Sequence, residues 1–148
     1  DELLHDPNTV IGLSDAGAHA SQLCDAKFST EFFSTFVRER QSFTLEEGVH
    51  MMTQRPAKVF GIHDRGTLAE GGFADVVVFD ANEIGHLGKR RVSDLPSGAD
   101  RLISDAKGID AVVVNGTVIR QHGEDQVAPI SGVAGAGLPG KLLRNGKG

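Results

Sequence analysis

The chain has no tryptophan, no tyrosine and a single cysteine among its 148 residues, although it has eight phenylalanines. Proteins that bind single-stranded nucleic acids combine aromatic platforms with positively charged grooves. The formal net charge of −5 and one short basic run, Lys89-Arg90-Arg91, supply neither of these features. We therefore expect no nucleic acid and no anionic membrane surface as a partner.

The lone cysteine, Cys24, cannot form a disulfide within the chain, which fits a reducing, cytoplasmic compartment. We interpret it as a small buried residue rather than a nucleophile. No apolar run approaches the roughly 20 residues of a membrane span, so no spanning helix is expected. The sequence starts without methionine and in the middle of a pattern at residues 1–5 (DELLH), which indicates that residues are missing upstream.

An apolar run that ends in a lone carboxylate organises the chain. Residues 9–13 are β-branched and apolar without alternation, which predicts a strand buried on both faces, as in a parallel sheet. Residues 14–26 follow as a long loop of small residues that carries Asp15 and His19, a composition typical of functional loops. A single strand of this kind needs neighbouring strands to satisfy its backbone groups.

Helical patterns occupy the next stretch. Residues 30–40 are predicted to form a helix, because phenylalanines recur there at i,i+4 spacing. Thr44 and Glu47 have the spacing of a capping box at the start of a second helix. The predicted apolar face of that helix consists of Leu45, Val49 and Met52. A short third helix at residues 57–60 is expected to end at Gly61.

The pattern then changes to β-structure. We expect a short strand and turn over residues 65–72, a buried strand over residues 74–80 and a polar, irregular excursion over residues 81–108. Asn115-Gly116 between two β-branched runs predicts a hairpin. Three regions follow from this order: residues 1–61 with the apolar strand, site loop and helices, residues 62–125 as a β portion, and residues 126–148 as a glycine-rich tail.

Asp15 and His19 are the candidate site residues. A carboxylate at the end of a barrel strand can bind a metal or act as a general base, and Asp in a loop can equally cap a turn. His19 can bind a ligand or simply hydrogen-bond to the loop backbone. The other five histidines have no H-x-H or H-E-x-x-H spacing, so the residues of this chain alone indicate no complete metal site.

Four segments resemble the amidohydrolase superfamily, in that family's order and spacing. Residues 11–19 (IGLSDAGAH) look like its last barrel strand, where an Asp closes the metal site. Residues 53–61 (TQRPAKVFG) resemble the following helix, residues 65–80 (RGTLAEGGFADVVVFD) the return to a small β-sandwich, and residues 114–118 (VNGTV) the last hairpin. The resemblance implies the C-terminal part of a metal-dependent (β/α)8-barrel hydrolase, with its last strand and helices, plus part of the β-sandwich.

Within the superfamily, residues 15–19 (DAGAH), 94–98 (DLPSG) and 138–144 (LPGKLLR) are most similar to the N-acyl-D-amino-acid deacylases, the D-aminoacylase group. This resemblance implies zinc-assisted hydrolysis of the amide of an N-acyl-D-amino acid, which releases a D-amino acid and a carboxylic acid. Asp15 maps onto the family's catalytic Asp, which activates the metal-bound water, protonates the leaving amine and can contribute a metal ligand. His19 is a weaker candidate for substrate binding.

The family's remaining metal ligands come from earlier barrel strands, which this chain does not contain, since a full barrel takes about 250 residues. We therefore expect this chain alone to be inactive and to need the upstream portion of the same enzyme as its partner. Exposed apolar surface is expected at the missing neighbours, so association into a homo-oligomer stays open. Two alternatives also stay open: a cyclic-amide hydrolase of the hydantoinase or dihydropyrimidinase kind, and a non-catalytic structural or oligomerisation module.

Overall fold

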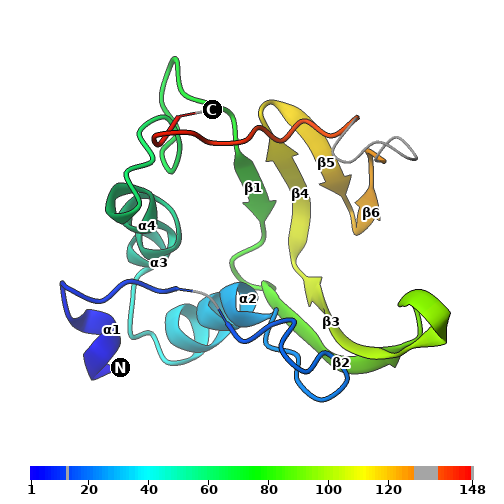
Figure 1. Cartoon of the computed structure of the whole chain (residues 1–148). Coiled ribbons are helices and arrows are strands. Elements are labelled where there is room, and N and C mark those ends of the chain that lie inside the picture. Colours follow the sequence, from blue (N-terminus) through cyan, green and yellow to red (C-terminus); the bar gives the residue numbers. More distant parts are fainter. Residues whose placement is uncertain (13, 129–136, 148) are drawn as a thin grey trace. The chain divides into compact units, whose positions relative to one another are not determined.

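The computed structural model describes residues 1–12, 14–128 and 137–147, and the chain divides into two compact units (Figure 1). Unit 1 comprises Asp1–Gly48 and Ala81–Gly108, and unit 2 comprises Val49–Asp80 and Ile109–Gly148. Leu13 of the predicted apolar strand and, in the predicted tail at 126–148, residues 129–136 and 148 lie outside the described residues. The three-region division at residues 61 and 125 stays a prediction.

Unit 1 begins with helices whose second half differs from the expected α-helix. After the short α1 (Glu2–His5), α2 (Phe28–Phe32) continues directly into η1 (Phe33–Glu39), which is a π-helix. At its end the Arg40 N–H donates to the Thr35 carbonyl five residues back, at 2.9 Å. A helix at residues 30–40 is therefore confirmed, but its wider second half was not predictable from i,i+4 spacing.

Helix α3 (Leu45–Met52) starts with the predicted capping box. The Glu47 N–H donates to the Thr44 hydroxyl at 3.2 Å, and the Thr44 N–H donates to the Glu47 carboxylate at 2.8 Å. Hydrogen bonding from the Thr44 N–H, and to a smaller extent from the Thr44 hydroxyl, holds the pKa of the exposed Glu47 carboxyl below its ordinary value. The first helical turn of α3 is thus fixed locally by its own sequence.

The predicted apolar face of α3 is wrong. Leu45 and Val49 are each 37% exposed, whereas Gly48 and Met51 are buried. A Cβ built on Gly48 lies 2.8 Å from Cγ2 of Val37, so only glycine allows the backbone of α3 to approach η1 this closely. The close approach at Gly48 therefore determines which face of α3 is buried, and hydrophobic periodicity does not indicate this face.

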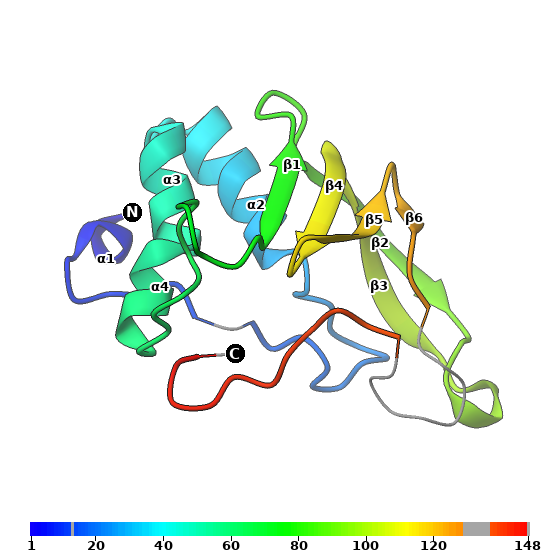
Figure 2. The ribbon, with the colours of Figure 1, turned by 90° about the horizontal axis from the view of Figure 1, so that it is seen from above.

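Residues 81–108 contain an antiparallel hairpin instead of the expected irregular excursion. Strand β2 (Gly85–Val92) pairs with β3 (Arg101–Lys107), and a short 3-10 turn, η2 (Pro96–Gly98), lies between them (Figure 2). The two strands carry charged side chains that form ion pairs. They lack the alternation of apolar and polar residues by which strands are predicted. These pairs are Arg90–Asp105, Arg91–Asp100 and Arg101–Asp94.

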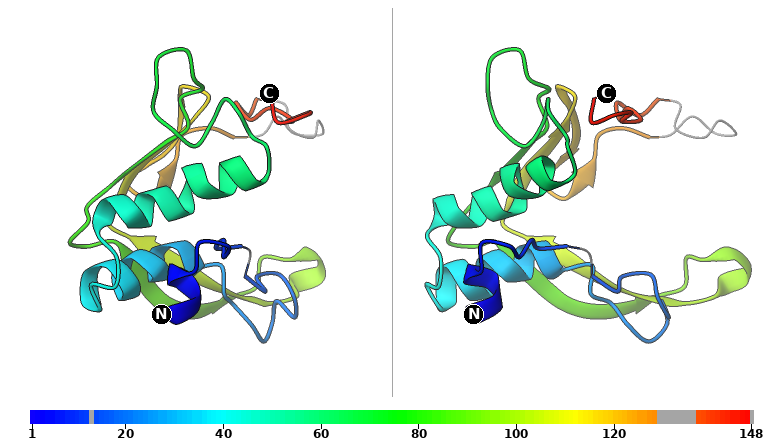
Figure 3. Two further views of the ribbon diagram at one scale, coloured as in Figure 1. Left: turned by 90° about the vertical axis from the view of Figure 1, so that its left-hand side faces the viewer. Right: turned by 60° about the vertical axis from the view of Figure 1, so that its left-hand side comes forward.

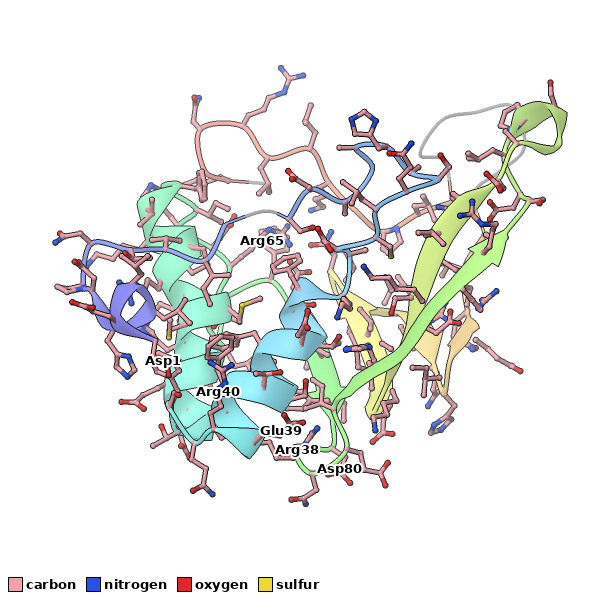
Figure 4. All side chains as sticks on the ribbon, turned by 90° about the horizontal axis from the view of Figure 1, so that it is seen from below. Asp1, Arg38, Glu39, Arg40, Arg65 and Asp80 are labelled. Carbon is pink, nitrogen blue, oxygen red and sulfur yellow. The ribbon has the colours of Figure 1, made fainter. Side chains whose placement is uncertain are left out.

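The base of this hairpin is tied to the helices of unit 1. Ile84 is buried, with 4% of its surface exposed, and its carbonyl accepts a hydrogen bond from the Arg38 guanidinium at 2.6 Å. Figure 4 shows Arg38 and Arg40 at the end of η1, and Arg40 pairs with Asp1 at 3.8 Å. Two-stranded hairpins are marginal alone, so this packing supports β2 and β3.

Unit 2 contains α4 (Gln54–Val59) and a four-stranded antiparallel sheet in the order β1-β4-β5-β6 (Figure 1). Its strands are β1 (Val76–Phe79), β4 (Ile109–Val114), β5 (Thr117–Gln121) and β6 (Glu124–Asp125). The predicted Asn115-Gly116 hairpin is confirmed, because both residues have positive φ, 48° and 79°, between β4 and β5. Gly61 ends α4 with φ 66°, also as predicted.

Two predictions for this β portion are wrong. Residues 65–70 form no strand, and β1 is not buried, because Val77 and Val78 are 52% and 48% exposed. The run of valines had indicated burial on both faces, but these two successive residues point to opposite faces of the sheet, so both faces of β1 are partly open. The described residues have mixed helical and sheet content, and no helix among them has the length and apolar character needed to cross a membrane.

The hydrophobic core is small. Seven apolar residues are buried and none of the described side chains falls below 2% exposure. Large apolar side chains lie exposed in both units, including Leu3 at 76% and Leu68 at 78%. The expected exposure of apolar surface is therefore present in the described residues.

An arginine connects three parts of unit 2. The Arg65 side chain, 12% exposed, pairs with Asp75, donates to the Asn115 side-chain oxygen at 2.8 Å and stacks over the Phe73 ring at 4.3 Å. The Asn115 side-chain amide donates in turn to the Pro139 carbonyl at 2.5 Å. Arg65 thus links the segment before β1, the β4–β5 turn and the C-terminal segment, and Figure 4 labels its position.

Candidate functional site

The apolar segment before Asp15 does not form the predicted strand. Residues 9–12 have no regular secondary structure, and no strand of the described residues pairs with them. The segment lacks the neighbours on both sides that a parallel-type strand requires. The prediction of a strand within this chain is wrong, while the predicted loop at residues 14–26 is confirmed.

Asp15 lies exposed at the start of this loop. Its backbone carbonyl accepts the Ala18 N–H at 3.0 Å, and the neighbouring Ser14 hydroxyl accepts the Ala16 N–H at 3.3 Å. Within the described residues the Asp15 carboxylate has no hydrogen-bond or ion-pair partner. The turn is thus capped by the Ser14 side chain, and the Asp15 carboxylate is left available to solvent or to a ligand.

His19 is exposed in the middle of the same loop, with a positive φ of 48°. Its backbone carbonyl accepts the N–H groups of Gln22 and Leu23 at 2.7 and 3.0 Å. This left-handed residue reverses the chain between Asp15 and the following turn. The structure brings both predicted site residues into one loop of unit 1.

The loop at residues 14–26, from here on the site loop, is held by the β2–β3 hairpin. The Leu102 N–H donates to the Ala20 carbonyl at 2.8 Å, and the Arg91 guanidinium donates to the Ser21 carbonyl at 3.0 Å. Lys89 lies 3.9 Å from the Asp25 carboxylate. In both views of Figure 3 the blue site loop runs beside the green hairpin.

Sequence reasoning missed these anchoring residues, since it assigned residues 81–108 to an irregular excursion. A signal was present: Arg90 and Arg91 are followed, across a Pro-Ser-Gly turn, by aspartates at 100 and 105. Opposite charges on both sides of a turn signal are the pattern of cross-strand pairs in an exposed hairpin.

The described residues do not form a complete metal site, since no three His, Cys, Asp or Glu side chains among them gather. A zinc ion takes three or four protein ligands. Asp15 fits as one oxygen ligand or as a base, because its carboxylate is exposed and free of partners within the described part of the chain. The remaining ligands of any metal beside Asp15 have to come from other residues.

Comparison with known proteins gives the family. A profile of the amidohydrolase family matches residues 1–120. N-acyl-D-glutamate deacylase of Alcaligenes xylosoxydans xylosoxydans is 43% identical over 90 residues, which is 61% of this chain and 17% of that protein. Dihydroorotase of Lactobacillus johnsonii is 45% identical over 56 residues, which is 38% of this chain and 13% of that protein.

Solved structures agree with this result. One is N-acyl-D-glutamate deacylase from Bordetella bronchiseptica, complexed with zinc and a phosphonate inhibitor that mimics the reaction's tetrahedral intermediate. It is 33% identical with a TM-score of 0.54, covering 78% of this chain and 20% of that chain. A D-aminoacylase crystal structure is 28% identical with a TM-score of 0.53, covering 66% of this chain and 19% of that chain.

This chain thus spans about a fifth of the length of the solved relatives that it matches. The family match, in contrast, extends from the N-terminal residues through the site loop, the helices and most of the β portion. The chain belongs to the amidohydrolase family and is D-aminoacylase-like.

Proposed function

We propose that this chain is the C-terminal part of a metal-dependent amidohydrolase that cleaves the amide of N-acyl-D-amino acids. The observation that carries the proposal is the Asp15 carboxylate, which is exposed and has no partner among the described residues, in a chain of this family. Relatives named as deacylases of N-acyl-D-glutamate and N-acyl-D-aspartate support the substrate class. The last strand of a (β/α)8 barrel and part of a β-sandwich belong to the same proposal.

Asp15 acts as general base and then as general acid. A carboxylate oxygen of Asp15 takes a proton from the water that attacks the amide carbonyl. It returns this proton to the leaving nitrogen, so that a neutral amine departs and a carboxylic acid remains. The exposed Asp15 side chain is open to a water molecule and a substrate. His19, four residues further along the loop, contributes to substrate binding.

Zinc is the proposed cofactor, and the zinc-bound deacylase relative supports this choice. When bound, zinc lowers the pKa of water and polarises the substrate carbonyl. Asp15 is the one residue that we assign to the metal side of the site from this chain. The upstream portion of the enzyme supplies the other ligands. A reducing, cytoplasmic compartment stays a prediction, and so does self-association of the protein.

Cyclic amides are the second candidate substrates, since dihydroorotases of several lactobacilli are among the relatives. Hydrolysis of a cyclic amide and of a linear amide requires the same proton transfers, so Asp15 keeps its role in both. The two functions differ in which substrate the rest of the site accepts.

A substrate panel on the zinc-loaded polypeptide, as its gene encodes it, tests the proposal. The panel contains N-acetyl-D-glutamate, N-acetyl-D-aspartate, their L enantiomers, a hydantoin and dihydroorotate. We expect turnover of the N-acyl-D-amino acids above all others. Preferential turnover of the cyclic amides replaces the first function with the second, and no turnover of any member in a zinc-replete protein refutes both.

A companion measurement tests the incompleteness of this chain. The 148 residues alone should show no turnover and weak zinc binding, because one carboxylate is too small a ligand set. Addition of the upstream portion should restore activity. A natural gene product as short as this chain favours the non-catalytic module, whereas a product several times longer supports the enzyme.

A further inference from the structure

We infer that Arg91 is a positioning residue, which holds the site loop so that Asp15 points where the reaction needs it. This inference rests on the proposed function of Asp15. Arg91 lies on β2, distant in sequence from the loop, and none of its hydrogen bonds or ion pairs among the described residues is to Asp15 or His19. Its guanidinium instead contacts the Ser21 carbonyl at 3.0 Å and the Asp100 carboxylate at 2.8 Å.

One cross-strand residue pair of the hairpin, Arg91 and Leu102, makes two hydrogen bonds to the middle of the site loop. Arg91 and Leu102 are directly opposite each other in the β2–β3 register. The Leu102 N–H donates to the Ala20 carbonyl, and the Arg91 side chain donates to the next carbonyl, that of Ser21. Two consecutive carbonyls of the loop are thus bound by the two partners of one cross-strand pair.

These carbonyls directly follow the residue that reverses the loop. His19 has positive φ, and Ala20 and Ser21 lie in the turn that the Gln22 and Leu23 N–H groups close on the His19 carbonyl, so a hold on them fixes the turn that directly follows the one at Asp15. The Ala18 N–H donates to the Asp15 carbonyl, which transmits this constraint to the backbone of Asp15 itself. A base displaced by about 1 Å can lose a large part of its rate, so a fixed loop has a catalytic consequence.

Asp100 orients the guanidinium for this task. The Asp100 carboxylate accepts a hydrogen bond from one terminal nitrogen of the Arg91 guanidinium. The other terminal nitrogen donates to the Ser21 carbonyl. A planar guanidinium can serve both acceptors at once, whereas an ammonium has no such fixed fork. The pair thus acts as a bracket between the hairpin and the loop.

The chain offers a matched control in the adjacent residue, Arg90. Its pair with Asp105 resembles that of Arg91 with Asp100, and the arginine side chains are 56% and 51% exposed. Successive strand residues point to opposite faces, so Arg90 lies on the other face of β2. Arg90 therefore reports the loss of one hairpin ion pair without loss of a loop contact.

Amide hydrogen exchange by mass spectrometry on the zinc-loaded gene product gives the first readout. In Arg91→Ala we expect peptides that cover residues 14–26 to exchange about three- to tenfold faster, the scale of one half-exposed charge-assisted hydrogen bond. Arg90→Ala should leave these peptides within about twofold of the wild type. Equal exchange of the loop in both variants overturns the inference.

Kinetics give the second readout. Arg91→Ala should lower kcat about tenfold because the base is misplaced, and KM should rise as well, because His19 lies in the same loosened loop. Arg91→Lys should recover part of the loss, and Arg90→Ala should behave as the wild type. Unchanged kcat in Arg91→Ala, while Asp15→Asn is inactive, overturns the inference alone. Unchanged kcat in both Arg91→Ala and Asp15→Asn refutes the proposed function of Asp15.

Discussion

Replacement of Arg65 should loosen unit 2 far more than replacement of a surface arginine. The Arg65 side chain is 12% exposed and binds Asp75 and Asn115 while it stacks over Phe73. Arg65→Met keeps much of the apolar stem but removes the contacts with Asp75 and Asn115 and the cation–π contact. After this change the Asp75 carboxylate keeps the hydrogen bond that the Asn115 backbone N–H donates at 2.8 Å, but it loses the arginine.

The magnitude follows from these contacts. Hydrogen bonds to charged groups contribute about 1.5–3 kcal/mol and a cation–π contact about 0.5–1 kcal/mol. Asp75 is itself 34% exposed, so water recovers part of the loss. We expect Arg65→Met to cost about 2–4 kcal/mol of local stability, which corresponds to roughly 30- to 1,000-fold faster exchange of protected amides.

Native-state hydrogen exchange of the β4–β5 amides is the assay. Arg120→Met is the control in the same sheet, because Arg120 forms an ion pair with Asp125 in which the two side chains are 49% and 72% exposed. This control should cost no more than about 1 kcal/mol. Equal effects of the two substitutions would show that the Arg65 contacts do not hold the hairpin and the C-terminal segment together.

Three further outcomes follow from single contacts. Burial raises the pKa of Asp75, but the Asn115 N–H and Arg65 lower it by more, so the folded pKa lies below the ordinary 3.8. The stabilisation is therefore present above about pH 4 and lost as pH falls through the folded pKa; urea midpoints followed by circular dichroism should drop there, and less in Asp75→Asn. Thr44→Ala should cost α3 about 1 kcal/mol in thermal unfolding, because the Glu47 N–H loses its side-chain acceptor. Gly48→Ala should destabilise by about 1–2 kcal/mol despite the better helix propensity of alanine, and Val37→Ala should relieve the clash; a stabilised Gly48→Ala contradicts this packing.

Local signals in the sequence predicted local structure well. The capping box of Thr44 and Glu47, the Asn115-Gly116 turn and the end of α4 at Gly61 depend on a few adjacent residues, and all three are confirmed. The face of α3 depends instead on how closely another helix approaches Gly48. The β2–β3 hairpin depends on charges paired across strands, which hydrophobic periodicity does not detect.

The sequence predicted the loop that carries the candidate residues but not the contacts that hold it. Asp15 and His19 stay predicted site residues, and the structure places both in one exposed loop. The strand before Asp15 was wrong because its formation depends on neighbouring strands rather than on its own apolar residues. Arg91 could not be found from the site segment, since it acts on the loop from β2.

The most direct test of the account is the rate of Asp15→Asn in the zinc-replete gene product with an N-acyl-D-amino acid. Asparagine keeps the size of the side chain but cannot accept the proton of the attacking water. Glu70→Gln is the control, since Glu70 is an exposed carboxylate outside the site loop. We predict that kcat falls by at least about 100-fold in Asp15→Asn and stays unchanged in Glu70→Gln. Wild-type turnover by Asp15→Asn would contradict the assignment of Asp15 as the base.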